Sequence, residues 1–271
     1  MPTVTVDFED CCQAFANSYD VGSLPAMRKV EQSVLGCDYG GTSWTTSEQA
    51  RQMIELLELG VEQHLLDIGA GSGWPALFLA AESGCQATLL DIPMNALEQA
   101  HTRAEADGTR SRVNAIAGSG TALPFGDCAF DVVSHSDVLC CLPEKLEMLK
   151  ECRRVIKDGA TSLFSVIAIT NDLPAADHAR AIEAGPPFVD APGDYSELLV
   201  KTGWRVERRI DVTSEHRQSL VALVEAFDTD ADLLDALGSE VVQDSRRRRQ
   251  EQIVAIDERL LVREIFLAIA G

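Results

Sequence analysis

The sequence predicts an α/β protein built around a doubly wound, mostly parallel sheet. Apolar runs typical of buried strands alternate with amphipathic segments typical of helices between residues 46 and 170. This alternation predicts parallel strands, because each helix carries the chain back to the edge where the next strand begins. The chain has 271 residues, of which 46% are hydrophobic, and such a chain can bury one full core. We therefore expect one sheet domain with a cap.

The first half of the sheet domain is expected to begin with a helix between Thr46 and Gly60. Thr46 and Gln49 have the spacing of a capping box, and apolar residues recur at helical intervals after them. The other elements expected in this half are strands at 64–68, 87–92 and 113–117 and helices from about Pro75 and at 95–106.

The second half continues the alternation as far as residue 170 and then changes character, because residues 171–193 are rich in Pro and Gly. We expect residues 1–45 to form an N-terminal cap segment and residues 46–271 to form the sheet domain, with cap insertions at 171–193 and 213–259. The expected elements are strands at 130–136, 161–170 and 204–212, helices at 144–155 and 195–202, a helical stretch at 214–259 and an antiparallel last strand at 261–270.

The charge of the chain argues against a nucleic-acid partner. With 23 basic and 43 acidic residues the formal net charge is −20, whereas binding to a phosphate backbone requires clustered Lys and Arg. The basic run SRRRRQ at residues 245–250 lies in an acid-rich helical stretch, which favours a solvated, ion-paired face over an anion-binding patch. The N-terminus lacks a secretory pattern and no run approaches the roughly 20 apolar residues that span a bilayer, so we expect a soluble cytoplasmic protein. Its oligomeric state stays open.

The eight cysteines predict free, mostly buried thiols rather than a metal centre. They occur as direct neighbours, at 11 and 12 and at 140 and 141, or alone, and no C-x-x-C pair is present. Adjacent cysteines do not present two ligands as a zinc knuckle does. We expect no metal, and a thiol role in substrate binding stays the alternative.

The segment LLDIGAGSGWPALFLA at residues 65–80 predicts a ligand-binding loop between a strand and a helix. Such a loop exposes free backbone N–H groups at the positive end of a helix, and glycine lets a ligand approach the backbone closely. Gly71, Gly73 and Ala76 satisfy the weak form of a dinucleotide-binding pattern. Asp67 would face a pyrophosphate unfavourably but could accept a hydrogen bond from a cationic amino group, so a cationic cofactor is favoured.

These residues resemble the first motif of class I S-adenosylmethionine-dependent methyltransferases. That motif has the form acidic-x-G-x-G-x-G, matched here by Asp67, Gly69, Gly71 and Gly73. Asp91 ends the second strand at the spacing expected of the family's ribose-binding carboxylate, and Ile92 would then pack on adenine. The segment AGSGTALPFGDCAFDVV at 117–133 is similar to the small-molecule and quinone methyltransferases. The resemblance covers residues 46–212 at least and implies a seven-stranded, Rossmann-like sheet with S-adenosylmethionine as the cofactor.

The same resemblance implies further cofactor contacts. Ser119 stands where the family commonly has an Asp that contacts the adenine amino group, and a serine can accept one such hydrogen bond. The segment CDYGGTSWTT at 37–46 resembles the part of the family that folds over the methionine end of the cofactor, where aromatic rings would attract a sulfonium. The other implied cofactor contacts are Thr121, Ala122, Ser134, Tyr39, Trp44 and Thr45.

Methyl transfer is an in-line displacement, so the protein must align the acceptor and exclude water, and a dedicated nucleophile is not required. An amine or phenol acceptor could use a general base, and the candidates are His135, at the carboxyl edge after the fourth strand, and His216, at the start of the helical insertion. Asp137 could orient His135 or begin the next helix. We expect a small-molecule methyl acceptor of unknown chemistry. The alternatives are an NAD(P)-dependent oxidoreductase and a cofactor-binding protein without catalytic activity.

Overall fold

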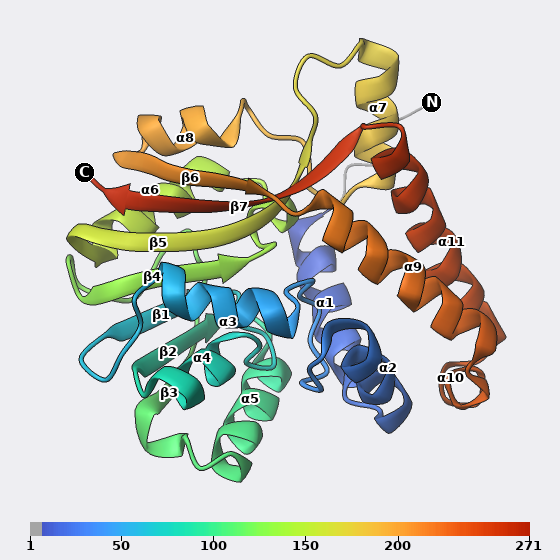
Figure 1. The fold of residues 1–271 in the computed structure, drawn as a ribbon, viewed down its shortest axis with the longest axis horizontal. Coiled ribbons are helices and arrows are strands. Elements are labelled where there is room, and N and C mark those ends of the chain that lie inside the picture. Colours follow the sequence, from blue (N-terminus) through green and yellow to red (C-terminus); the bar gives the residue numbers. More distant parts are fainter. Residues whose placement is uncertain (1–6) are drawn as a thin grey trace.

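A computed structural model, which describes residues 7–271, contains one seven-stranded sheet with the strand order β3-β2-β1-β4-β5-β7-β6 (Figure 1). Neighbouring strands pair in parallel except where β7 pairs with β5 and β6, so the predicted fold class and its antiparallel last strand are confirmed. The strands are β1 (His64–Ile68), β2 (Gln86–Asp91), β3 (Val113–Ala117), β4 (Phe130–Ser136), β5 (Ile156–Ile169), β6 (Trp204–Asp211) and β7 (Leu261–Ala270). β5 begins five residues before the strand that we expected at 161–170.

The strand order reverses direction at β1, which lies between β2 and β4. In open parallel sheets such a reversal opens a crevice beyond the carboxyl ends of the two central strands, because the connections leave in opposite directions. Asp67 and Ser134 are register partners close to these ends of β1 and β4. The fold therefore brings the glycine loop after β1 and the residues after β4 to one place.

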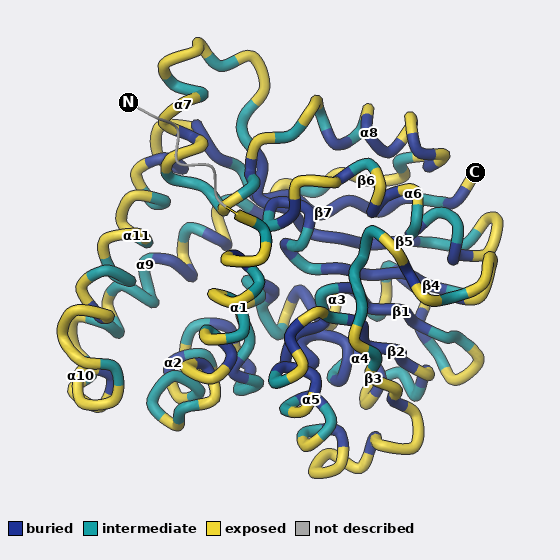
Figure 2. The backbone as a smooth tube through the Cα atoms, turned by 180° about the vertical axis from the view of Figure 1, so that it is seen from behind, coloured by how far each residue is buried: buried dark blue, intermediate teal, exposed yellow. Residues whose placement is uncertain are grey.

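Alternate side chains of the central strands enter two separate cores. Leu65 and Val132 pack in the core under α3 (Ser47–Leu56), α4 (Ala76–Ser83) and α5 (Met94–Ala106). Leu66 and Val133 pack in the core on the other face, under α6 (Lys145–Val155) and α8 (Tyr195–Lys201). Figure 2 shows buried backbone through the sheet and exposed backbone on the outer sides of the helices. The sheet is thus covered on both faces, as continuous apolar strands require.

The helix expected after Thr46 is confirmed together with its cap. The Thr46 hydroxyl accepts a hydrogen bond from the Gln49 backbone N–H, and the Gln49 side chain accepts from the Thr46 N–H, each at 3.2 Å. Short 3₁₀ turns lie at Arg110–Arg112 (η1) and Leu139–Cys141 (η2). Cys140 and Cys141 therefore lie in a turn before α6.

The cap segments are more helical than the sequence indicated. Residues 8–45 contain α1 (Phe8–Gly22) and α2 (Pro25–Leu35), and the 171–193 segment contains α7 (Ala175–Ala184). The helical stretch after β6 is divided into α9 (Thr213–Thr229), α10 (Ala231–Leu237) and α11 (Ser239–Asp257). It breaks at Asp230, which caps α10, and at Gly238, whose φ of 79° is left-handed. Residues 1–6 of the expected cap segment lie outside the described residues.

The cap helices α1, α2, α9, α10 and α11 gather beyond the carboxyl edge of the parallel strands (Figure 1). Direct contacts join α2 to α9 and α10, and α7 to α11. Within residues 7–271, no helix has both the length and the apolar character needed to cross a membrane.

Candidate cofactor and acceptor site

The glycine loop after β1 is held against the end of β2. The Leu90 carbonyl accepts hydrogen bonds from the N–H groups of Gly69 at 2.7 Å and Ala70 at 3.1 Å. Gly71 has a φ of 54°, and a Cβ there would lie 2.5 Å from the Tyr19 hydroxyl oxygen. Gly73, with a φ of 100°, is similarly crowded by Leu77. Only glycine fits at these positions without strain or displacement of a neighbour.

Two carboxylates face this loop from the ends of β1 and β2. Asp91 accepts hydrogen bonds from the N–H groups of Gly71 and Ile92, each at 2.7 Å. Asp67 accepts from the Ser134 hydroxyl at 2.5 Å. Burial raises the pKa of Asp67 to about 7 and that of Asp91 to about 6, although the hydrogen bonds oppose both shifts. Neither carboxylate has an ion-pair partner in the described part of the chain, so the site carries an uncompensated negative charge that suits a cationic ligand.

Helix α1 covers the loop, and this contact was not expected from the sequence. The Tyr19 side chain of α1 is buried against Gly71, and its hydroxyl lies 3.4 Å from the Thr42 hydroxyl. The remaining space at the loop is about 20 Å³ and is lined by Tyr19, Gly41, Thr42, Ser43, Gly69, Ala70, Gly71, Ser72, Trp74 and Ser136. Ligand pockets for small molecules are typically about 300 Å³ or more, so the space left under α1 and residues 41–43 is smaller than a nucleotide-sized ligand.

Of the three residues predicted from the segment before α3, Thr45 contacts two residues that line the space at the loop. Its hydroxyl is 3.3 Å from that of Ser136, and its carbonyl accepts a hydrogen bond from the Trp74 indole at 2.7 Å. Tyr39 packs instead against Trp74, at 5.1 Å between ring centroids, with Arg103 on its ring. None of the three predicted residues, Thr45, Tyr39 and Trp44, itself lines the space at the loop.

The residues expected around adenine lie at the same edge as Asp91. The Asp91 carbonyl accepts a hydrogen bond from the Gly118 N–H at 3.0 Å, which brings the segment after β3 beside β2. The Ser119 hydroxyl is 2.8 Å from that of Thr121, and the Ser119 carbonyl accepts from the Ala122 N–H at 3.2 Å. Ile92 is 40% exposed, which leaves its side chain accessible to a ligand.

His135 does not reach the site, and the prediction that it lines the site as a base is therefore corrected. Its neighbours in β4 point toward the loop, since Ser134 contacts Asp67 and Ser136 contacts Thr45. Because side chains alternate along a strand, the His135 ring points to the other face of the sheet, where it stacks on Phe164 at 4.5 Å. It is 1% exposed, and burial lowers its pKa to about 3. His135 is a neutral core residue.

His216 lies at the start of α9 and contacts the cap side of the site. It is buried, and its ring packs edge-on against Trp44 with 4.9 Å between centroids. Burial, reinforced by Arg263, lowers the pKa of His216 to about 3, so the imidazole is neutral at pH 7. Its Nδ1, like that of His135, is buried without a hydrogen-bond partner among the described residues, but His216 lies on the cap and against Trp44. Such a nitrogen can interact with a ligand group.

A buried ion pair that the sequence did not indicate fastens the segment before α3 to the sheet. Arg263 of β7, which is 0% exposed, donates hydrogen bonds to the Asp137 carboxylate at 2.9 and 3.0 Å. It also contacts the hydroxyls of Thr45 at 3.4 Å and Ser165 at 3.0 Å. Asp137 therefore has neither of the two roles expected from the sequence, which were to orient His135 or to begin a helix. Burial opposes its charge, but Arg263 holds the pKa of Asp137 below its ordinary value.

Two thiols near the site, those of Cys141 and Cys11, have pKa values raised above the ordinary value. Cys140 and Cys141 lie with their sulfur atoms 4.0 Å apart, and the hydrogen bond with Cys140, followed by burial, raises the pKa of Cys141 well above its ordinary value. Burial likewise raises the pKa of Cys11 on α1. All eight cysteines are free, as predicted. Raised thiol pKa values argue against a thiolate nucleophile.

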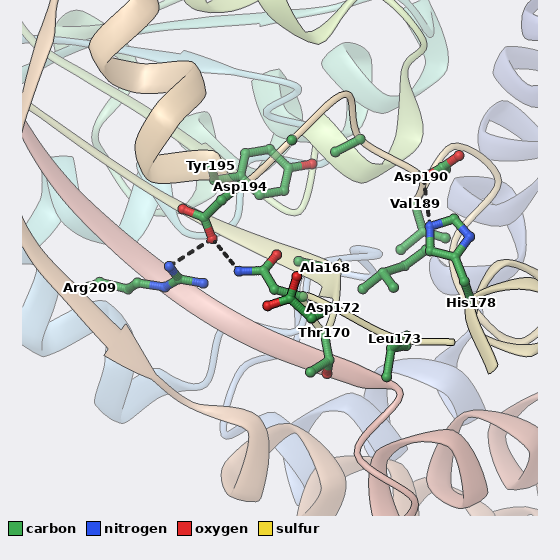
Figure 3. A pocket seen from close by; sticks show the side chains of 14 residues that line it. Ala168, Thr170, Asp172, Leu173, His178, Val189, Asp190, Asp194, Tyr195 and Arg209 are labelled. Carbon is green, nitrogen blue, oxygen red and sulfur yellow. Dashed lines mark hydrogen bonds and ion pairs between the residues drawn. The ribbon is translucent and has the colours of Figure 1, made fainter. Parts of the chain in front are cut away.

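A larger cavity of about 200 Å³ lies beyond the end of β5, between α7, α8 and β6 (Figure 3). It shares no lining residue with the space at the glycine loop. His178 pairs there with Asp190 at 3.2 Å, and Arg209 pairs with Asp194 at 2.8 Å. Because these charged groups already have partners, we assign the chemistry to the glycine loop instead.

Comparison with known proteins agrees with this geometry. Residues 66–164 match a family model described as a methyltransferase domain. The chain is 27% identical to methyltransferase GfsG of Streptomyces halstedii over 72% of this chain and 71% of that protein. It is also 27% identical to the 27-O-demethylrifamycin SV methyltransferase of Amycolatopsis mediterranei over 68% of this chain and 69% of that protein.

Among solved structures, the fold resembles that of phosphoethanolamine N-methyltransferase 2 of Haemonchus contortus, determined with S-adenosylhomocysteine. The TM-score is 0.80 at 17% identity, over 100% of this chain and 61% of that one. At this identity the likeness shows the fold, while the family match and the relatives identify the family. The chain is a class I S-adenosylmethionine-dependent methyltransferase, an enzyme that transfers the methyl group of this cofactor to a small-molecule acceptor.

Proposed function

We propose that S-adenosylmethionine lies along the glycine loop, with Asp67 and Asp91 as its charged partners, and that the acceptor meets it beside Thr45 and Ser136. The observation that carries this proposal is the pair of buried carboxylates that face the loop without an ion-pair partner within residues 7–271. When bound, S-adenosylmethionine supplies a methyl group activated by a sulfonium centre. The crowded glycines and the two unpaired carboxylates fit a cationic cofactor of this kind.

The individual roles follow the resemblance seen in the sequence. Asp91 would accept hydrogen bonds from the ribose hydroxyls, while Ile92 and the segment with Ser119, Thr121 and Ala122 would enclose adenine. Asp67, oriented by Ser134, would face the amino group at the methionine end. Tyr19 on α1 would close over the loop and exclude water, which lowers the competition from hydrolysis.

We assign binding of the methyl acceptor to the cap, which consists of residues 1–45 and the insertions at 171–193 and 213–259. His216 belongs to this cap and carries a neutral imidazole beside Trp44. A neutral imidazole can accept a hydrogen bond from an O–H or N–H group of the methyl acceptor and so orient the lone pair of that group. Because the pKa of His216 is about 3, His216 is a weak general base. We therefore assign His216 a positioning role toward the acceptor. Free thiols throughout the chain fit a reducing compartment, and we assign the enzyme to the cytoplasm.

The proposal is tested by calorimetry with S-adenosylmethionine, S-adenosylhomocysteine, NAD and NADP, followed by a screen of metabolites for acceptance of labelled methyl. We expect both adenosyl ligands to bind and the nicotinamide cofactors not to bind. Binding of a nicotinamide cofactor alone would overturn the proposed site in favour of an oxidoreductase. Binding of S-adenosylhomocysteine without methyl transfer to any member of a broad panel would favour a cofactor-binding protein without catalysis.

A further inference from the structure

The basic run at residues 245–250 of α11 is not the uniform solvated face that its composition predicts. Three of its four arginines do behave as expected. Arg246 pairs with Asp228 at 2.6 Å, Arg247 with Asp244 at 2.5 Å, and Arg248 with Asp244 at 2.9 Å. Arg249 is the exception, because no acidic side chain among residues 7–271 pairs with it.

Arg249 points toward the core of the cap. Its guanidinium carbon lies 5.3 Å from the centroid of the Trp44 ring, and its Nε is buried without a hydrogen-bond partner in the described part of the chain. The other arginines that lack a carboxylate partner within residues 7–271 are all exposed, and water can solvate them; they are Arg110, Arg112, Arg208 and Arg259. A partly buried guanidinium without a counter-ion is costly, particularly in a chain of net charge −20 that could supply one.

Trp44 connects Arg249 to the proposed reaction site. The residue before it, Ser43, lines the space at the glycine loop, and the residue after it, Thr45, contacts Ser136. His216 packs against the Trp44 ring as well. Arg249 is thus placed beside an aromatic ring whose two neighbours in the chain reach the loop and Ser136. Asp67 and Asp91 make the loop end of the site negative, and Arg249 makes the cap end positive.

We propose that Arg249 binds an oxyanion, a carboxylate or a phosphate, on the methyl acceptor. This inference rests on the proposed function, because it takes the cap side of the loop as the acceptor site. A guanidinium offers several N–H donors in a planar fork that matches both oxyanions, and the Arg249 guanidinium lies over the Trp44 ring. An anionic acceptor would also be kept away from the carboxylates of the cofactor end, which fixes its orientation in the site.

The test compares the wild-type protein with Arg249→Gln and Arg249→Lys, and uses Arg248→Gln as the matched control on the same helix. Acetate and inorganic phosphate are the probes, and acetamide is the neutral analogue of acetate, all at constant ionic strength with saturating S-adenosylhomocysteine. Binding is followed by the shift of the Arg249 Nε–H resonance in ¹⁵N-arginine-labelled protein and by the melting temperature. Acetate and phosphate titrations run separately, so the two oxyanions are distinguished.

We expect at least one oxyanion to shift the Arg249 resonance and to raise the melting temperature, while acetamide does neither. Arg249→Gln should weaken that binding by on the order of 10- to 100-fold, Arg249→Lys should restore part of it, and Arg248→Gln should leave it unchanged. Equal oxyanion binding in Arg249→Gln and wild type, or no response of the Arg249 resonance, would overturn the inference.

S-adenosylhomocysteine affinity, measured on the same variants, separates this inference from the proposed function. All four proteins should bind the cofactor product alike, because Arg249 does not line the loop. Failure of the wild type to bind it would refute the proposed function, whereas normal cofactor binding with no oxyanion effect would refute only the role of Arg249. Once an acceptor is found, replacing its acid group by the methyl ester should remove the difference in KM between wild type and Arg249→Gln.

Discussion

Arg263 and Asp137 are 126 residues apart in the sequence, yet they form a buried ion pair with two hydrogen bonds of 2.9 and 3.0 Å. The pair joins β7 to the turn after β4, and further contacts from Arg263 reach Thr45 and Gln49. The segment that carries Ser43, Trp44 and Thr45 therefore takes its place at the glycine loop partly through this one guanidinium.

Removing one partner of this pair should destabilise the protein strongly. Arg263→Met leaves the Asp137 carboxylate buried and uncompensated, and we expect a loss of about 3 to 5 kcal/mol in the free energy of unfolding, measured by urea titration. Asp137→Leu combined with Arg263→Met should cost less than Arg263→Met alone, because no buried charge is left. Arg217→Met, in an exposed pair with Asp257, is the control and should change little. A loss of similar size in the control would argue against the buried-charge explanation.

Asp91→Ala should weaken S-adenosylhomocysteine binding by about 2 to 4 kcal/mol, because the ligand loses a charged hydrogen-bond acceptor and the loop loses its anchor at Gly71. Calorimetry measures this difference directly. Asp235→Ala, on the exposed side of α10, serves as the control and should bind normally. A folded Asp91→Ala variant with wild-type affinity would remove Asp91 from the cofactor site.

The buried carboxyl of Asp67 should make the stability of the ligand-free protein depend on pH. Its pKa is raised from 3.8 to about 7 by burial, so the folded state binds a proton that the unfolded state releases between these two values. The stabilisation from this proton is present below about pH 4 and is lost as the pH rises through 7. Asp67→Asn should therefore be more stable than the wild type at pH 8, by at most about 4 kcal/mol, with a smaller difference at pH 5.5.

Ligand binding should show the opposite preference, because a cationic cofactor needs the ionised carboxylate. S-adenosylmethionine affinity should fall as the pH is lowered through 7 in the wild type. Asp67→Asn should lose the part of this dependence that lies near pH 7 and keep the part due to Asp91, whose pKa is about 6. Urea titration and calorimetry at pH 5.5 and 8 measure both effects. Equal stability of the two proteins at pH 8 would show that Asp67 is ionised in the folded state at no cost.

The two histidines should separate in kinetics once an acceptor is known. His135→Leu should keep kcat and KM within about twofold of the wild type, since its ring lies in the core against Phe164. His216→Ala should raise the KM of the acceptor or lower kcat by about tenfold or more, because a hydrogen-bond acceptor beside Trp44 is lost. His216→Asn, which can still accept a hydrogen bond, should recover part of the activity. If His135→Leu abolished turnover in a folded protein, the assignment of His135 to the core would be wrong.

Gly71→Ala should impair both folding and cofactor binding. The new Cβ would lie 2.5 Å from the Tyr19 hydroxyl oxygen, and a φ of 54° is unfavourable for a side chain. We expect a lower melting temperature and at least tenfold weaker binding of S-adenosylhomocysteine. Gly126→Ala is the control, because a Cβ there meets nothing within 4 Å. Normal binding of S-adenosylhomocysteine by Gly71→Ala would show that α1 moves away from residue 71 at little cost in free energy.

Local features of the sequence determined the order of strands and helices between residues 46 and 170, the capping box at Thr46 and the glycine loop with its two acidic strand ends. Each of these features depends on residues close together in the chain, so it can be recognised without knowing which distant residues they contact. The antiparallel last strand at 261–270 was likewise expected from its place at the end of an α/β alternation.

Tertiary structure alone decided which side chains reach the site. Strand β4 is buried on both faces, so apolar residues occur at successive positions and the sequence has no alternation that would show which way His135 points. Tyr19, Arg249 and Arg263 come from helices and a strand far from the loop in sequence. Only packing brings Tyr19 against Gly71, Arg249 against Trp44 and Arg263 against Asp137. The same arginine run that composition describes as a solvated face contains one residue that the packing of α11 turns toward Trp44, because a helix places successive side chains on different faces.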